Sequence, residues 1–352
     1  MVYVFVNYYK KVRNGVNIDA AKEIESVRNI ICTANLEIWN SDRVSCNTSA
    51  FYNNVLPLIN SFERKIPYSI AMERDMYYEF KIPKASGGLR TITAPKEELK
   101  IVQAAIAKHL IKDCKLIFHN SVHSYTKNRN CLTALQAHQK RNAKYFLKLD
   151  IKDFFPSCTP EIVWGACNNL INTVHLDKVN ILLRDIDEFI FYKDALPQGS
   201  PLSPILSNVV LQSFDYYFNQ YCVSKGMCYT RYADDLLISK DCKFDWQEVA
   251  QQAELMLPEN MVLKHHKTRY GSCNGKNWNL GLMYNKDKQI TVGHKQKHYI
   301  QCAYHNLYRD MPENFNQQLR SLVGLFQYYK HIEPEYFTAL EQKLNAKGYV
   351  TI

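Results

Sequence analysis

Apolar and polar residues alternate along three short stretches of the chain, and this kind of alternation predicts β-strands. Residues 76–95 contain two strand-favouring runs around a glycine-rich turn at 86–88, which predicts a hairpin. Residues 145–150 alternate between two faces and should form a strand that ends on Asp150. Residues 229–239 follow the pattern of a strand, a tight turn and a second strand.

Other stretches repeat apolar residues at helical spacing, which is typical of one buried helix face. Pro95 should open one such helix, and a second follows Pro201. The region 307–344 predicts a helical C-terminal subdomain, while residues 20–34 have helical character in an N-terminal extension. The apolar positions are Leu99, Val102, Ile106 and Leu110, then Leu202, Ile205, Leu206, Val209 and Val210, and finally Leu319, Leu322, Phe326 and Tyr329.

The composition predicts a folded protein with a basic surface. Of the 352 residues, 46% are hydrophobic and 22% are charged, unlike a disordered chain. The 44 Lys and Arg residues exceed the 34 Asp and Glu residues, giving a net charge of +10. Such a surface should attract a polyanion such as a nucleic acid, although charge alone fits any basic protein equally well.

The 11 cysteines form no Cys-x-x-Cys pair and have no histidine spacing that would complete a zinc site. We interpret them as reduced, mostly buried residues. The apolar run at 2–6 is too short for a signal peptide, and no apolar stretch is long enough to span a bilayer. We therefore expect a cytoplasmic protein without a membrane partner.

Candidate chemistry comes from three aspartates. Asp234 and Asp235 are adjacent within an otherwise apolar hairpin, where neighbouring carboxylates repel each other and a bound cation would relieve the repulsion. Asp150 is a candidate third ligand, because magnesium prefers oxygen ligands. Two ions held this way can support in-line phosphoryl transfer. Taken singly, each Asp is more commonly a turn former or a solvated loop residue.

Three motifs occur in order: residues 149–155 read LDIKDFF, residues 197–204 read PQGSPLSP, and residues 232–235 read YADD. In this combination the chain resembles prokaryotic reverse transcriptases, roughly from Tyr77 to the C-terminus. The resemblance implies an α+β right-hand polymerase fold with fingers, a palm of antiparallel sheet plus helices, and a helical thumb. The expected regions are an N-terminal extension at 1–60, fingers and a template-contacting region at 61–145, the palm with an interleaved fingers segment at 146–285, and the thumb at 286–352.

The resemblance also implies an RNA-directed DNA polymerase that uses two Mg²⁺ ions, with Mn²⁺ as an alternative. Asp150, Asp234 and the backbone carbonyl of Ile151 would coordinate the metals, and Asp235 would support the site. A primer 3′-hydroxyl would attack the α-phosphate of a deoxynucleoside triphosphate (dNTP). Lys267 matches a family lysine proposed to donate a proton to the leaving pyrophosphate, and a plain surface lysine is the alternative.

Residues expected to hold the incoming nucleotide lie around these motifs. Phe155 matches an aromatic ring that packs beneath the sugar where a 2′-hydroxyl would sit, so deoxynucleotides should be preferred. Lys84 and Arg90 resemble fingers residues that grip the triphosphate. Gln198 and Gly199 begin a loop beneath the nucleotide and the template base. The nucleotide-binding set is Lys84, Arg90, Asp153, Phe154, Phe155, Gln198 and Gly199.

Residues expected to contact template and primer are mostly basic. The segment 123–134 resembles a template-contacting fingers motif, and 280–282 resembles the primer-gripping turn. The basic stretch 286–297 resembles the beginning of the thumb, where cations would contact phosphates and binding should weaken with salt. The set is Lys127, Arg129, Tyr232, Leu280, Gly281, Lys295 and Lys297.

Only a short thumb follows the polymerase motifs, without the maturase and endonuclease regions of full-length group II intron proteins. Retron and antiphage-defence reverse transcriptases have similar length and usually work with a dedicated structured non-coding RNA. RNA template, DNA product and an accessory protein or second copy are the implied partners. Asn279 to Gly281 and His138 depart from retron patterns, which favours a defence-associated enzyme outside the retrons. A retron or group II intron-derived enzyme is the alternative.

Two further alternatives concern activity. A catalytically idle RNA-binding scaffold could retain the fold, but intact Asp150, Asp234 and Asp235 argue against it. An RNA-dependent RNA polymerase could share the same carboxylates, and Phe155 argues against that.

Overall fold

The computed structural model describes most of the chain from residue 76 onward, and the helix expected at 20–34 lies outside it. The expected site residues Lys84 and Leu280 also fall outside the described residues. The structure describes residues 54–58, 61, 76–83, 87–112, 116–174, 187–273, 278 and 281–350.

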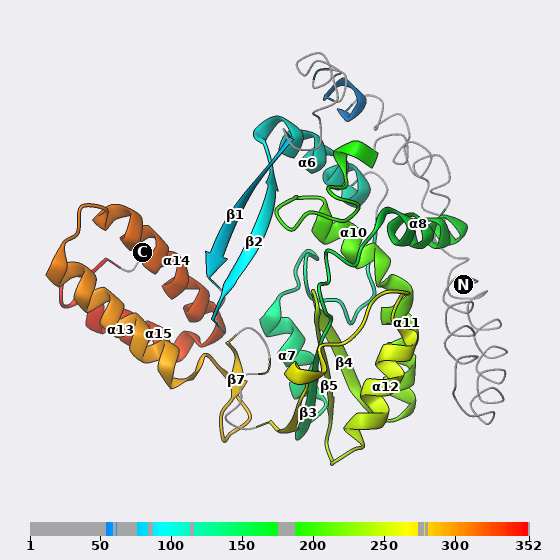
Figure 1. The fold of residues 1–352 in the computed structure, drawn as a ribbon. Coiled ribbons are helices and arrows are strands. Elements are labelled where there is room, and N and C mark those ends of the chain that lie inside the picture. The colour runs from blue at the N-terminus through cyan, green and yellow to red at the C-terminus, as the bar shows by residue number, and fades with distance from the viewer. Residues whose placement is uncertain are drawn as a thin grey trace.

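A four-stranded antiparallel sheet in the order β4-β5-β3-β6 forms the centre of the molecule. Its strands are β3 (Tyr145–Asp150), β4 (Cys228–Tyr232), β5 (Asp235–Lys240) and β6 (Arg269–Ser272). The strands predicted at 145–150 and 229–239 are therefore confirmed, and β3 lies between β5 and β6. Figure 1 shows β3, β4 and β5 together in this sheet.

One face of this sheet packs against helices. Leu147 and Leu149 of β3 point into this core, and the apolar positions predicted for the two helices after Pro95 and Pro201 lie in it as well. Figure 1 shows α11 and α12 running beside the sheet. The elements on this side are α6 (Glu97–Lys112), α8 (Pro160–Val174), α10 (Ser203–Val210), α11 (Gln212–Ser224) and α12 (Trp246–Met256).

The other face of the sheet is also buried, because Phe146 of β3 belongs to a second core with α7 (Cys131–Lys140) and the C-terminal helices. Its ring stacks on Trp278 at a centroid distance of 5.2 Å. The helical C-terminal region predicted from the sequence is confirmed as α13 (Gly293–Asp310), α14 (Phe315–Ile332) and α15 (Pro334–Asn345), preceded by the short strands β7 (Met283–Tyr284) and β8 (Ile290–Thr291).

The predicted hairpin is confirmed as β1 (Tyr77–Pro83) paired with β2 (Leu89–Pro95). Gly87 and Gly88 before β2 have φ values of 88° and 80°, which glycine adopts readily. The hairpin runs from the neighbourhood of α6 toward the C-terminal helices (Figure 1). Two short 3₁₀ helices occur in the part of the chain that the structure describes, at Asp187–Phe189 and His265–Lys267. No helix within the described ranges is long and apolar enough to cross a membrane. The expected α+β class is confirmed.

Candidate active site

Asp150, Asp234 and Asp235 lie together at one end of the central sheet. β3 ends on Asp150, and β5 begins on Asp235, which is its cross-strand partner. Asp234 lies in the turn between β4 and β5, and its carbonyl accepts a hydrogen bond from the Ile151 N–H at 3.0 Å. The structure thus brings together the carboxylates selected from the sequence. Their catalytic role stays a prediction.

The electrostatics of Asp234 reflect this crowding. Burial raises the pKa of Asp234, and the negative charges of Asp235 and Asp150 raise it further. A carboxylate in such a place is stabilised in its charged form by any cation that approaches it. The cluster therefore has the electrostatic character of a cation site.

Three lysines already contact this cluster. Lys264 Nζ and Lys267 Nζ lie 2.8 Å and 3.3 Å from the two carboxylate oxygens of Asp150, and Lys148 Nζ lies 2.6 Å from Asp235 Oδ2. Of these, sequence reasoning selected only Lys267. Lys148 could have been found, because it lies two residues before Asp150 and so shares its face of the strand. Lys264 had no comparable signal, because an isolated antiparallel bridge between Ile151 and Leu263 brings it here.

The residues after Asp150 divide into core and surface. Phe154 is buried in the core at 4% exposure, while Phe155 is half-buried with its ring centroid 5.4 Å from that of Phe154. Asp153 is exposed with a φ of 44°, and its carbonyl accepts a hydrogen bond from the Ser157 N–H at 2.8 Å. Phe155 is therefore the aromatic side chain of this pair with surface available to a ligand.

The loop that begins with Gln198 and Gly199 lies against β2. The Gly199 N–H donates a hydrogen bond to the Thr93 carbonyl at 2.8 Å. A Cβ at Gly199 would lie 2.7 Å from Thr93 O and from Ala94 Cα. The close approach of this loop to the hairpin thus leaves no room for a Cβ at position 199, and glycine is required there. Gln198 is half-buried, and Arg90 is exposed on β2 opposite Ile82.

The expected template- and primer-contacting residues differ in their surroundings. Lys127 is exposed, whereas the Arg129 guanidinium donates to the carbonyls of His119 and Val122 at 2.7 and 2.8 Å, so it fastens its own loop. Tyr232 is half-buried at the end of β4, opposite Asp235.

The remaining expected contacts lie around α13. Gly281 has a φ of 91° in the turn before β7. Lys295 is exposed, while Lys297 forms an ion pair with Glu333 and lies 4.1 Å from the centre of the Tyr336 ring. Of the two lysines, Lys295 is the more available to a phosphate.

His138 is buried between α7 and the central sheet and contacts two hydroxyl groups of the strands. It is fully buried, with Nδ1 2.6 Å from Ser239 Oγ and Nε2 2.8 Å from Thr230 Oγ1. Burial lowers its pKa to about 3, so the ring is neutral. It joins α7 to β4 and β5.

Across the described ranges, no three His, Cys, Asp or Glu side chains form a group that could by itself hold a metal ion. Magnesium commonly takes only one or two carboxylates and fills its remaining positions with water and substrate phosphates. The aspartate cluster fits a magnesium site of this kind, in which carboxylates fill only one or two of the metal's positions.

Comparisons with known proteins agree with this geometry. The pattern of the family described as Reverse transcriptase (RNA-dependent DNA polymerase) matches residues 82–299. The Retron Ec83 reverse transcriptase of Escherichia coli is 28% identical over 280 residues, covering 76% of this chain and 86% of the relative. The Retron Mx65 reverse transcriptase of Myxococcus xanthus is 29% identical over 297 residues, covering 80% of this chain and 68% of the relative. Apo telomerase from Candida tropicalis has a similar fold, with a TM-score of 0.50, 12% identity, and coverage of 84% of this chain and 64% of that chain.

Proposed function

Because this chain belongs to the reverse transcriptase family of RNA-directed DNA polymerases, we propose that it adds deoxynucleotides to a primer 3′-hydroxyl with two magnesium ions held at Asp150 and Asp234. The observation that carries this proposal is the meeting of Asp150 with the 234–235 turn across the β3–β5 ladder. Sites of this reaction need several carboxylates on a rigid support, and adjacent paired strands provide one.

The chemistry of the donors supports divalent cations at this place. The charges of Asp150 and Asp235 act on Asp234, and Asp150 forms ion pairs with Lys264 and Lys267. The Ile151 carbonyl follows Asp150 directly and is the third proposed donor. Two divalent ions bound here would activate the attacking hydroxyl and neutralise the departing pyrophosphate; Mg²⁺ is the expected ion and Mn²⁺ the alternative.

The lysines of the site have separate proposed tasks. Lys267 is 46% exposed at its side chain and reaches Asp150 from the surface, so it can turn toward a leaving pyrophosphate and donate a proton. Lys148 keeps Asp235 in place from inside the sheet, with both side chains more than four-fifths buried. This supports Asp235 as an accessory carboxylate whose main partner is Lys148.

Nucleotide selection is assigned to residues around Phe155. Its half-buried ring would lie beneath the sugar and exclude a 2′-hydroxyl, which favours deoxynucleotides. Arg90 on the hairpin would bind the triphosphate, because its planar guanidinium suits phosphate oxygens. The Gln198 loop, bonded to β2 through Gly199, would place the template base.

The template partner is proposed to be a dedicated structured non-coding RNA. The retron relatives support a retron-type enzyme over the defence enzyme outside the retrons that the sequence departures favoured. A role in antiphage defence, a cytoplasmic location and an accessory protein or second copy remain parts of this proposal. Sequencing of nucleic acid that copurifies, after separate RNase and DNase treatment, tests it. A discrete RNA is expected, and purification without any RNA would contradict it.

Primer extension on an RNA template tests the catalytic proposal. Asp150→Asn and Asp234→Asn should each abolish incorporation, because a neutral amide is a poor ligand for magnesium. Asp241→Asn is the matched control, because Asp241 follows β5 at the end opposite Asp235 and is exposed. Chelation of divalent ions should stop the wild type and the control alike. Undiminished incorporation by Asp234→Asn would contradict the metal assignment.

The deoxynucleotide preference has its own test. Phe155→Ala should accept ribonucleotides more readily than the wild type does, measured as the ratio of kcat/KM for matched dNTP and rNTP substrates. Equal use of both sugars by the wild-type protein would contradict the proposed role of Phe155.

A further inference from the structure

The turn that carries Asp234 has an uncommon backbone conformation. Ala233 lies in the left-handed region with a φ of 55°, where residues with a Cβ are rarely found. The turn also brings Asp234 close to the charges of Asp150 and Asp235. Because like charges repel, contacts that fix this turn would oppose any movement that separates the carboxylates.

Both peptide groups of Ala233 are hydrogen-bonded to buried side chains, one from Ser124 in a distant loop and one from Arg231 in the adjoining strand β4. Its N–H donates a hydrogen bond to Ser124 Oγ at 2.8 Å, and its carbonyl accepts one from Arg231 Nη1 at 3.1 Å. Ser124 and Arg231 are both at 0% exposure. Hydrogen bonds shielded from water in this way are electrostatically stronger than exposed ones and hold their geometry.

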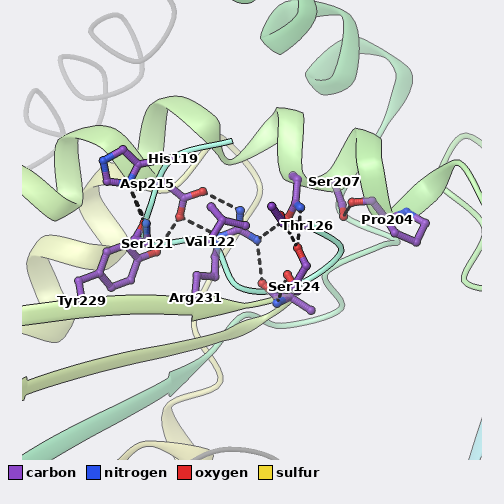
Figure 2. Close-up of polar contacts among 12 residues, drawn as sticks. His119, Ser121, Val122, Ser124, Thr126, Pro204, Ser207, Asp215, Tyr229 and Arg231 are labelled. Carbon is purple, nitrogen blue, oxygen red and sulfur yellow. Dashed lines mark hydrogen bonds and ion pairs between the residues drawn. The ribbon is translucent and has the colours of Figure 1, made fainter. Parts of the chain in front are cut away.

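Arg231 is itself fixed by Asp215 of α11. Its Nε and Nη2 donate to the two carboxylate oxygens of Asp215 at 2.8 and 2.6 Å, and Figure 2 shows this pair beside Tyr229. Asn208 accepts from Nη1 at 3.0 Å and donates through Nδ2 to the Ser124 carbonyl at 3.0 Å. Since a bidentate pair fixes the plane of the guanidinium, Nη1 is aimed at the turn.

The loop that contains Ser124 is joined to β4 by its backbone. The Arg231 N–H donates to the Ser121 carbonyl, and the His123 N–H donates to the Arg231 carbonyl, both at 2.8 Å. Figure 2 shows Arg231 between Asp215 and this loop. Two bonded backbone positions thus place Ser124 next to Ala233.

We propose that Ser124 and Arg231, supported by Asp215 and Asn208, are positioning residues that hold Ala233 and thereby aim the Asp234 carboxylate. This inference rests on the proposed function, since it concerns the same metal-binding turn. An ion pair that only fastened α11 to β4 would need no bond to Ala233, whereas this network supplies one to each of its peptide groups.

The test compares Ser124→Ala with Ser207→Ala in the full chain. Both serines are fully buried, but Ser207 Oγ donates to the Pro204 carbonyl within its own segment at 2.9 Å. Primer extension gives kcat, the KM for dNTP and the Mg²⁺ concentration for half-maximal rate. For Ser124→Ala we expect kcat and Mg²⁺ dependence to worsen by roughly 10-fold or more, as when groups that orient metal ligands are removed. The KM for dNTP should stay within about twofold, because the substrate contacts remain.

The Mg²⁺ midpoint does not depend on the fraction of irreversibly inactive protein. Because reversible unfolding would raise the midpoint, the assay is run well below the unfolding temperature of Ser124→Ala, measured in the same buffer. Arg231→Lys keeps the positive charge but lacks the planar guanidinium that can bond Asp215 and Ala233 together. It should shift the Mg²⁺ midpoint in the same direction. A Mg²⁺ midpoint and kcat equal to those of Ser207→Ala would overturn the inference, provided that Asp234→Asn is inactive. Activity in Asp234→Asn would instead overturn the proposed function.

Discussion

Substitution of Gly199 by alanine should damage the site through one close approach. The added Cβ would lie 2.7 Å from Ala94 Cα and Thr93 O and 2.8 Å from Ala94 Cβ. The φ of Gly199 is outside the left-handed region, so alanine introduces no backbone strain of its own. The backbone of β2 at this point is paired with β1 through Thr93 and Glu79. The loop, the hairpin or both must therefore move.

The size of that movement follows from van der Waals contact distances. The optimal separation between non-bonded carbon atoms is about 3.5–4.0 Å, so the loop and β2 must move apart by roughly 1 Å. Overpacking of this kind typically costs about 1–3 kcal/mol of folding free energy. A displacement of about 1 Å in residues that place substrate can lower the rate by roughly 100-fold. We therefore expect a large loss of kcat/KM for dNTP with a modest loss of stability.

The assay is steady-state primer extension with varied dNTP, together with thermal unfolding. Gly324→Ala is the control, because a Cβ at this position in α14 would meet no atom within 4 Å. That control should keep full activity and gain about 0.5–1 kcal/mol, since alanine favours a helix interior over glycine. If Gly199→Ala matched Gly324→Ala in kcat/KM and unfolding temperature, the packing argument would be refuted.

Three further predictions concern stability. Asp215→Leu leaves the Arg231 charge buried and unpaired, so the protein should lose about 3–5 kcal/mol, seen as a lower unfolding temperature; an unchanged temperature would contradict this. The pKa of Asp234 is raised by burial and like charges, so its ionisation opposes folding as pH rises through that pKa; Asp234→Asn in chelator should therefore unfold at a higher temperature than wild type at pH 7, with the gain shrinking on acidification. Because burial lowers the pKa of His138 to about 3 from 6.5, the unfolded state binds more protons between these values, and calorimetry should show stability falling as pH drops below about 6.5; His138→Gln should flatten that fall.

Local patterns were enough to predict the elements that carry the carboxylates. Alternation in 145–150 and 229–239 follows from strands with distinct faces, and glycines mark the β1–β2 turn. What the alternation missed is that both faces of β3 are buried, one with Leu147 and the other with Phe146. Period alone does not tell what covers a face.

The support of the turn could not be predicted from spacing. Ser124 and Ala233 are 109 residues apart, and their bond depends on how the 119–130 loop lies along β4. Arg129, whose contact with nucleic acid stays a prediction, donates hydrogen bonds to three acceptors of its own loop: two carbonyls and Asn120 Oδ1. An arginine in a basic loop looks the same in sequence whether it binds phosphate or carbonyl oxygens.

Single-nucleotide extension on a defined RNA template tests the central claim most directly. A DNA primer annealed to RNA is incubated with Mg²⁺ and each dNTP separately, using wild type, Asp234→Asn and Asp241→Asn. The account predicts extension by one residue with the complementary dNTP only, in wild type and Asp241→Asn but not in Asp234→Asn. Extension that ignores the template base, or that persists in Asp234→Asn, would contradict it.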